Sequence, residues 1–160
     1  MVKLHGLFNS NRHLNANQTP KRYSARGKIA NNTPDELKGY GAAEVFILGT
    51  RALVFYTFKV SAVSTNTSDF SYGLNRDLLQ TANPNIPYIT PISGGTATVY
   101  NTSGQIDSGI NQYGIYHDAI GQFWPLARLA DTAGTTGDWP VSKITAGITV
   151  KGIAIGNVSS

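Results

Sequence analysis

The 160-residue chain has no cysteine, few charged residues and no long apolar run. Without cysteine it can form no disulfide, and it has no thiolate to act as a nucleophile or metal ligand. No run approaches the ~18 consecutive apolar residues of a membrane span, and the N-terminal stretch has too few apolar residues for the core of a secretory signal. We therefore expect a protein that is made in the cytoplasm, carries no signal peptide and does not insert into a membrane.

Small polar residues are abundant where charge is scarce. Only 14% of the residues are Asp, Glu, Lys or Arg, whereas Gly, Ser, Thr and Asn together make up 58 residues. This composition favours strands, turns and protein contact surfaces over solvated helices, which usually contain many Glu, Lys and Ala. The length suits a single domain that buries roughly 68–70% of the surface exposed by the unfolded chain.

The charges are distributed unevenly along the chain. The first 34 residues carry six basic residues and no acid, whereas the remaining 126 carry seven basic and nine acidic residues. The six basic residues are Lys3, Arg12, Lys21, Arg22, Arg26 and Lys28. Such a segment is expected to seek an acidic surface on a protein or a nucleic acid.

Residues 1–33 show no sustained helical or strand periodicity and contain few large apolar side chains. We therefore expect an extended basic arm without a core of its own. A short helix that acts as a hinge is expected at residues 34–40, because Thr33 and Glu36 can form a capping box at its start.

The clearest strand pattern lies at residues 52–63, after a short apolar run and a Gly-Thr turn signal. The side chains alternate with a period of two, which is the period of a strand. One face is apolar throughout: Val54, Tyr56, Phe58, Val60 and Ala62. The other face carries Leu53 and Phe55 and then becomes polar. We expect a long strand whose second face is covered only locally.

The rest of the chain contains turn residues at short intervals. Asn75 to Gln80 can form one helical turn, and the prolines at 84, 87 and 91 exclude a central strand and suggest an edge or linker segment. In the last segment the apolar alternation shifts phase across Lys151 and Gly152, which suggests a bulge. The strand candidates are residues 96–101, 113–118, 123–129 and 142–158.

Seven or eight short strands at this spacing are typical of an antiparallel β-sandwich or small barrel. The sequence therefore predicts a mainly β fold with a single domain of this kind at residues 41–160, after the extended basic N-terminal arm and one short helix.

Motifs for catalysis or metal binding are missing. The three histidines show no metal-ligand spacing, and the chain has no P-loop, dinucleotide fingerprint or nucleophile elbow. Loop aspartates could form a carboxylate pair, but such residues more often cap turns. We therefore expect no enzyme activity, no cofactor and no metal site. The residues weighed are His5, His13, His117, Asp107, Asp118, Asp131 and Asp138.

Aromatic residues cluster in the last third of the chain and flank turns. Exposed rings there could stack on sugars or anchor a protein interface, and the candidates are Tyr113, Tyr116, Trp124 and Trp139. The alternative is that Tyr116 and Trp124 belong to the core of the domain. Trp139, in a loop, is the strongest candidate for a contact.

The basic arm could bind nucleic acid or protein. Only Phe8 and Tyr23 are available in it for base stacking, and its positive residues are spread rather than gathered in one block. An extended polar arm can instead lie across a neighbouring subunit, with its charges paired locally. Because the domain after the arm is itself slightly acidic, we favour a protein partner over nucleic acid.

The chain resembles a group of viral proteins in its overall texture. It combines the absence of cysteine and internal methionine with a basic arm, a Gly/Thr/Asn-rich β domain and a glycine-punctuated segment at residues 148–157. In this it looks like small structural proteins of tailed-phage virions, particularly capsid decoration or cement proteins.

The resemblance implies a non-enzymatic homo-oligomer in the virion that bridges subunits of the major capsid protein, or contacts another virion protein, and stabilises the shell. A phage tail, collar or fibre protein has the same texture. A carbohydrate-binding or receptor-binding β domain is a further alternative, and it would use the four aromatic candidates as a sugar platform.

Overall fold

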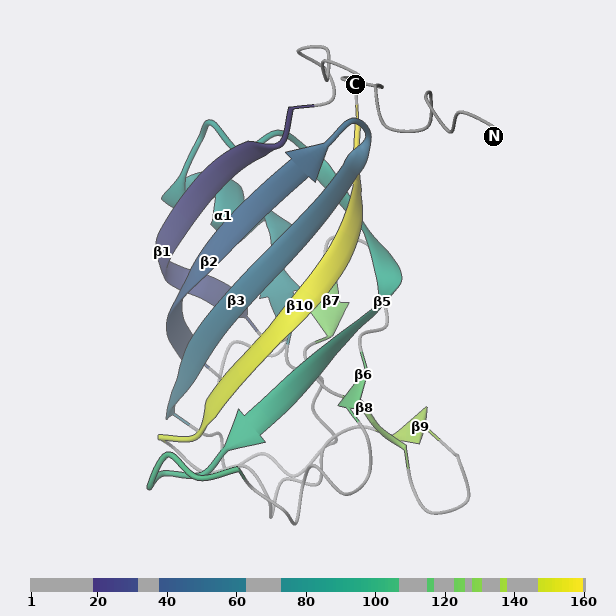
Figure 1. Ribbon diagram of the computed structural model, residues 1–160. Coiled ribbons are helices and arrows are strands. Elements are labelled where there is room, and N and C mark those ends of the chain that lie inside the picture. Colours follow the sequence, from purple (N-terminus) through teal and green to yellow (C-terminus); the bar gives the residue numbers. More distant parts are fainter. Residues whose placement is uncertain are drawn as a thin grey trace, which may run out of the picture.

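The structure, a computed structural model, describes residues 19–31, 38–62, 73–106, 115–116, 123–125, 128–130, 136–137 and 147–159. Strands dominate it, and the helix α1 (Arg76–Ala82) is short (Figure 1). The strands are β1 (Lys21–Asn31), β2 (Lys38–Leu48), β3 (Arg51–Ala62), β4 (Gly73–Asn75), β5 (Ile89–Tyr100), β6 (Ile115–Tyr116), β7 (Phe123–Pro125), β8 (Arg128–Ala130), β9 (Thr136–Gly137) and β10 (Thr149–Val158). The mainly β class predicted from the sequence is confirmed.

Seven strands form one sheet in the order β5-β10-β3-β2-β1-β4-β7, and β6, β8 and β9 form a second, smaller sheet. The paired strands are antiparallel, as expected. Figure 1 shows the five long strands in one curved layer, with α1 and β7 behind it. The last strand in the order, β7, reaches back to β10 across the core, so the sheet curls around its own interior. The long strands form this one curled sheet, and a two-sheet sandwich or closed barrel is not confirmed.

Part of the predicted arm is a strand of this sheet. β1 pairs with β2 from Lys21, opposite Ile47, to Ala30, opposite Gly39. Its inward-facing residues Ala25 and Ile29 are buried in the core. The prediction of an extended arm is therefore wrong for residues 21–31, because a strand that is hydrogen bonded to β2 along its length needs only a few buried apolar groups to be held in place. Residues 1–18 lie outside the described part of the chain.

The hinge helix expected at residues 34–40 is wrong at its C-terminal end, because β2 begins at Lys38. A strand there pairs its backbone with β1 and β3 on both sides, which a short helix could not do. Residues 32–37 lie outside the described ranges.

The helical turn predicted after residue 75 is confirmed and extends to Ala82. Asn75 caps its start, because the side-chain Oδ1 accepts hydrogen bonds from the backbone N–H groups of Asp77 at 2.7 Å and Leu78 at 3.2 Å. At the other end, the side-chain amide of Asn83 donates to the carbonyl of Ser24 in β1 at 2.8 Å. The helix thereby lies against the inner side of β1 and places Leu79 in the core.

The β2–β3 hairpin confirms the strand and turn predicted for this segment. Leu48 pairs with Arg51 across a two-residue turn, in which Gly49 has φ +59°. Along β3 the predicted alternation holds. Ala52, Val54, Tyr56 and Phe58 are buried. The residues between them point to the opposite, exposed side of the sheet.

The prolines fall where the sequence placed them, at an edge. β5 is one of the two edge strands of the seven-stranded sheet, and Pro91 lies within it opposite Gly156. The bulge predicted at Gly152 is wrong. β10 keeps continuous register with β3, and its pairing with β5 shifts only between Ala154 and Ile155, where β5 has the extra residues Ser93 and Gly94.

Gly152 is required for another reason. A Cβ there would collide with the hydroxyl of Tyr56 and lie 2.6 Å from the carbonyl oxygen of Thr96. The phase shift in the sequence has a separate cause, because Val150 faces the core whereas Ile153 and Ile155 face outward.

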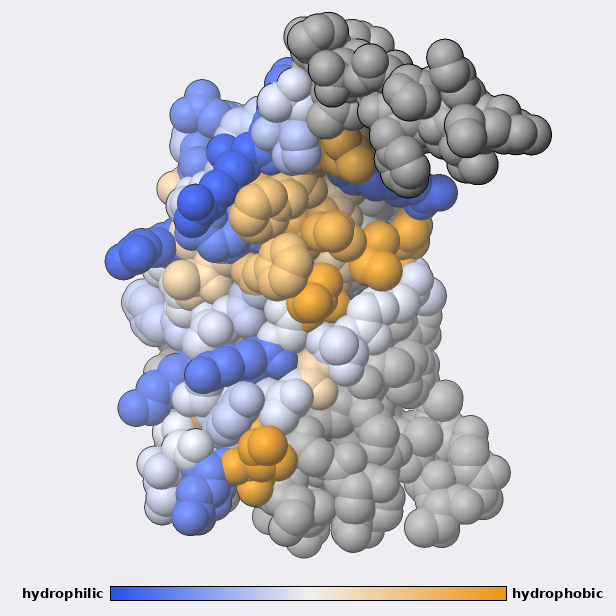
Figure 2. All heavy atoms as spheres, viewed as in Figure 1, coloured by the Kyte–Doolittle hydropathy of each residue, from blue (hydrophilic) through white to orange (hydrophobic). Residues whose placement is uncertain are grey.

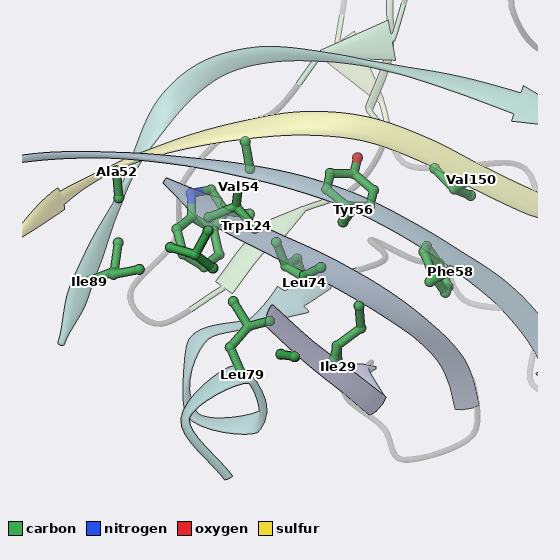
Figure 3. Packing of buried hydrophobic residues seen from close by; sticks show 14 of the residues in the cluster. Ile29, Ala52, Val54, Tyr56, Phe58, Leu74, Leu79, Ile89, Trp124 and Val150 are labelled. Atoms are coloured by element: carbon green, nitrogen blue, oxygen red, sulfur yellow. The ribbon is translucent and has the colours of Figure 1, made fainter. Parts of the chain in front are cut away.

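The core lies between the long strands and the layer formed by α1, β4 and β7. Figure 3 shows the indole of Trp124 within a cluster that includes Val54, Leu74 and Ile89. Trp124 is fully buried, and its Nε1 donates to the backbone carbonyl of Ile155 at 2.8 Å. Its prediction as an interface residue is therefore wrong, because both the ring and its polar atom are already satisfied inside the protein.

Candidate functional site: the outer face of the sheet

The five long strands have one face toward the core and one face away from it, which we call the outer face. Because side chains alternate along a strand and the strands are in register, the residues of the outer face form continuous rows across the sheet. One row joins Glu44, Phe55 and Ile153. The next row joins Phe46, Leu53 and Ile155. No described element covers these rows (Figure 1).

An apolar hollow of about 770 Å³ lies on the outer face over β2, β3 and β10. Figure 2 shows it as a patch of hydrophobic residues with hydrophilic residues around it. Leu48, Leu53 and Phe55 are 55%, 42% and 41% exposed, and the rings of Phe46 and Phe55 meet edge to face with centroids 5.6 Å apart. The residues that line this apolar hollow are Pro20, Glu44, Phe46, Leu48, Arg51, Leu53, Phe55 and Ile155.

At one end of the apolar hollow, hydrogen bonds fix the position of the Glu44 side chain. Arg22 Nε donates to Glu44 Oε2 at 2.7 Å, and the hydroxyl of Ser24 donates to Glu44 Oε1 at 2.9 Å. The Arg22 guanidinium also lies 5.8 Å from the centre of the Phe46 ring. The hydrogen bonds from Arg22 and then Ser24 lower the pKa of the Glu44 carboxyl below its ordinary value. Glu44 is thus kept ionised and already satisfied.

Arg51 occupies the other end of the apolar hollow, beside the β2–β3 turn. Its Nη1 donates to Asn157 Oδ1 at 2.6 Å, which links β3 to the cross-strand neighbour on β10. An amide oxygen orients a guanidinium without cancelling its charge. The remaining donors of Arg51 can therefore reach a ligand in the apolar hollow.

A second, more polar hollow of about 450 Å³ adjoins the first and shares Glu44 and Phe55 with it. Thr57, Thr96 and Thr98 line it, together with Lys151. The ammonium of Lys151 lies 4.7 Å from the centre of the Tyr100 ring, a cation–π contact that steadies the side chain at the far end. We call this the polar hollow.

The outer face carries a strong excess of positive charge. Among the described residues whose register places them on this face there is one acid, Glu44. The cations on it are Arg22, Arg26, Lys28, Arg51, Lys59 and Lys151. Among the described residues, only one of these six cations, Arg22, forms a salt bridge with an acid, so the surface attracts anionic groups.

The structure separates the basic residues that the sequence grouped in one arm. Arg22, Arg26 and Lys28 lie on the outer face, whereas Lys21 pairs with the inward-facing Ile47. Lys21 lines a separate hollow of about 380 Å³ at the end of the sheet, with Tyr23 and Val158 among its neighbours. Lys3 and Arg12 lie outside the described residues.

The aromatic candidates do not form a platform in the part of the chain that is described. Trp124 is buried, and Tyr116 lies in β6 of the small sheet. Tyr113 and Trp139 fall outside the described ranges, as do all three histidines and the aspartates Asp107, Asp118, Asp131 and Asp138.

Sequence reasoning missed Phe46, Leu48 and Arg51 as site residues. Two patterns in the sequence that the predicted core did not explain could have pointed to this site. Leu53 and Phe55 are apolar on the partly covered face of β3, and the phase shift brings Ile153 and Ile155 to the same side of β10. Only the register of the two strands shows that these patterns meet.

The described residues contain no group of three or more His, Cys, Asp or Glu side chains that could hold a metal ion. The one helix among them has seven residues, and no helix in these ranges is long and apolar enough to cross a membrane.

Comparison of the chain with protein-family models, with curated proteins and with solved structures gives no match.

Proposed function

We propose that the protein is a non-enzymatic structural protein that assembles onto another protein through the outer face of its sheet. The observation that carries this proposal is the apolar hollow, where large apolar side chains gather on a face that no described element covers. Contiguous exposed apolar patches with polar rims mark interaction surfaces, because docking removes the apolar area from water. Cross-strand pairing holds the patch on a firm sheet rather than on loops.

The resemblance of the sequence to capsid decoration and cement proteins suggests which assembly this is. We propose a virion protein that docks on the major capsid protein, or on another virion protein, and stabilises the shell. Pro20 lines the apolar hollow, so the N-terminal end of the described chain lies beside the docking face. We propose that Lys3 and Arg12 of the same basic segment take part in the contact. Contacts between copies in a homo-oligomer would use other surfaces, because two basic faces repel each other.

The sugar-platform alternative loses support from the position of Trp124. A ring that stacks on a sugar must be exposed, and this one is fully buried. A tail, collar or fibre position fits the outer face as well as a capsid position does, so the experiment must separate these locations.

The test is to separate native particles on a density gradient after nuclease treatment and to detect the protein with an antibody. Sedimentation with capsid shells is the expected result. Sedimentation with tails or fibres alone would show that the protein belongs to those structures and not to the capsid. Absence from every particle fraction would overturn the virion proposal.

A matched pair of variants tests the role of the outer face in the same assay. Leu53→Asp places a charge in the apolar hollow, and we expect at least a tenfold loss of particle association. Ile106→Asp makes the same kind of change at a residue that is 59% exposed but lines neither hollow, and should leave association unchanged. Equal behaviour of the two variants would exclude the outer face as the docking surface.

A further inference from the structure

The apolar hollow and the polar hollow are joined, and together they form a track across the outer face. They share Glu44 and Phe55, with Arg51 at the apolar end and Lys151 at the polar end. We propose that this track binds a segment of a partner protein that carries apolar side chains between two acidic residues. The inference rests on the proposed function, because it names the chemistry of the partner for the same face.

The positions of the two cations set the length of the segment. Arg51 of β3 is hydrogen bonded to Asn157 of β10. Lys151 lies six positions before Asn157 on β10. At about 3.3 Å per residue this is a separation of roughly 20 Å along β10. An extended partner segment would therefore place its two carboxylates about six residues apart, with the apolar side chains between them nearer to Arg51.

Charge disfavours two occupants that the chain itself could supply. A second copy docked face to face would set six cations and one acid against the same set. Residues 1–18 contain Lys3 and Arg12 and no acid, so their charge has the same sign as that of the face. An acidic segment from another protein is complementary, and complementary charge favours encounter and suppresses wrong partners.

The middle of the track disfavours nucleic acids and anionic membranes. Glu44 lies in the wall that the two hollows share, where it is ionised and already satisfied by Arg22 and Ser24. A nucleic-acid strand carries a charge at every nucleotide and would bring phosphates close to this carboxylate. A flat lipid surface cannot fill a recess. A protein segment with acids only at its ends avoids both difficulties.

The test measures binding of short synthetic peptides to the full chain by fluorescence polarisation. The first peptide has two Glu about six positions apart with two Leu between them, and the matched control has Lys in place of both Glu. We expect the Glu peptide to bind at least tenfold more tightly. Equal affinity for the two peptides would overturn the proposal.

Charge-reversal variants assign the two ends of the track. Arg51→Glu and Lys151→Glu should each weaken binding of the Glu peptide by about fivefold to tenfold. Lys21→Glu makes the same change on a residue that faces away from the track, and should leave binding unaltered. Arg51→Glu should also improve binding of a peptide in which only the end nearer Arg51 carries Lys. Loss of affinity without this exchange of preference would overturn the assignment, because damage to the fold cannot reverse charge selectivity.

Other occupants give distinct results with the same protein. Leu53-dependent binding to phosphatidylserine vesicles or to random-sequence duplex DNA, tighter than binding to the Glu peptide, would overturn the proposal. So would dimers that Leu53→Asp dissolves, or peptide binding that appears only after deletion of residues 1–18. If Leu53→Asp abolishes particle association while Arg51→Glu and Lys151→Glu do not, the inference fails and the proposed function stands.

Discussion

The indole of Trp124 in β7 is hydrogen bonded to the backbone carbonyl of Ile155 in β10, with 2.8 Å between Nε1 and the oxygen. Ile155 is the residue at which β10 shifts register against β5, and its own side chain lines the apolar hollow on the outer face. The buried Trp124 ring therefore connects β7 to β10 across the core, directly behind the surface that we propose for docking.

Replacing this ring should affect folding rather than docking. Trp124→Phe removes the donor to a buried carbonyl and should lower the free energy of unfolding by about 1–3 kcal/mol. Trp124→Ala also leaves a cavity and should cost about 3–5 kcal/mol. Urea denaturation of both variants measures these losses. If Trp124→Phe had wild-type stability but weaker particle association, the ring would have to be reassigned to an interface.

Any side chain at Gly152 should lower the stability of the protein, because the backbone of β10 lies directly against the Tyr56 hydroxyl at this position. Gly152→Ala adds a methyl group against this hydroxyl and the carbonyl of Thr96, and we expect a loss of about 1–3 kcal/mol. The loss should be smaller in a Tyr56→Phe background, since the nearest of the three atoms that the Cβ would meet is gone.

Thermal or urea unfolding of the four proteins in this double-mutant cycle measures the coupling between the two positions. Thr57→Ala, at an exposed position of β3, is the control and should change stability by no more than about 0.5 kcal/mol. Additive losses from Gly152→Ala and Tyr56→Phe would show that the hydroxyl does not limit the space.

Burial raises the pKa of the Tyr56 hydroxyl well above its ordinary value, because the interior disfavours the phenolate. In the unfolded chain this group ionises near pH 10, whereas in the folded protein it keeps its proton. Above about pH 10 the unfolded state therefore binds fewer protons than the folded state, and stability falls as the pH rises, by at most about 1.4 kcal/mol per pH unit for this group.

Urea unfolding at a series of alkaline pH values tests this linkage. The wild-type protein should lose stability above about pH 10 more steeply than Tyr56→Phe, which has no hydroxyl to ionise. Below that pH the difference between the two proteins should be constant. Parallel curves throughout the alkaline range would mean that Tyr56 ionises equally easily in both states.

Local patterns in the sequence predicted the elements that depend on local physics. The alternation at residues 52–63 predicts β3 because a period of two can satisfy one buried face only in a strand. Asn75 predicts the start of α1 because its side chain can accept from the first free backbone N–H groups. Pro91 predicts an edge strand, since it has no N–H to donate to a second neighbour.

The sequence by itself therefore determined the mainly β class, the turn at Gly49 and Thr50 with the long strand after it, and the uneven charge. Only the tertiary structure decided that residues 21–31 join the sheet, because Ala25 is too small to give an apolar signal until β2 and α1 pack against its strand. It also decided that Trp124 is core, and that Leu53 and Ile155 meet in one hollow. The physical reason is that a face of a sheet is assembled from strands distant in sequence, and its composition depends on their register.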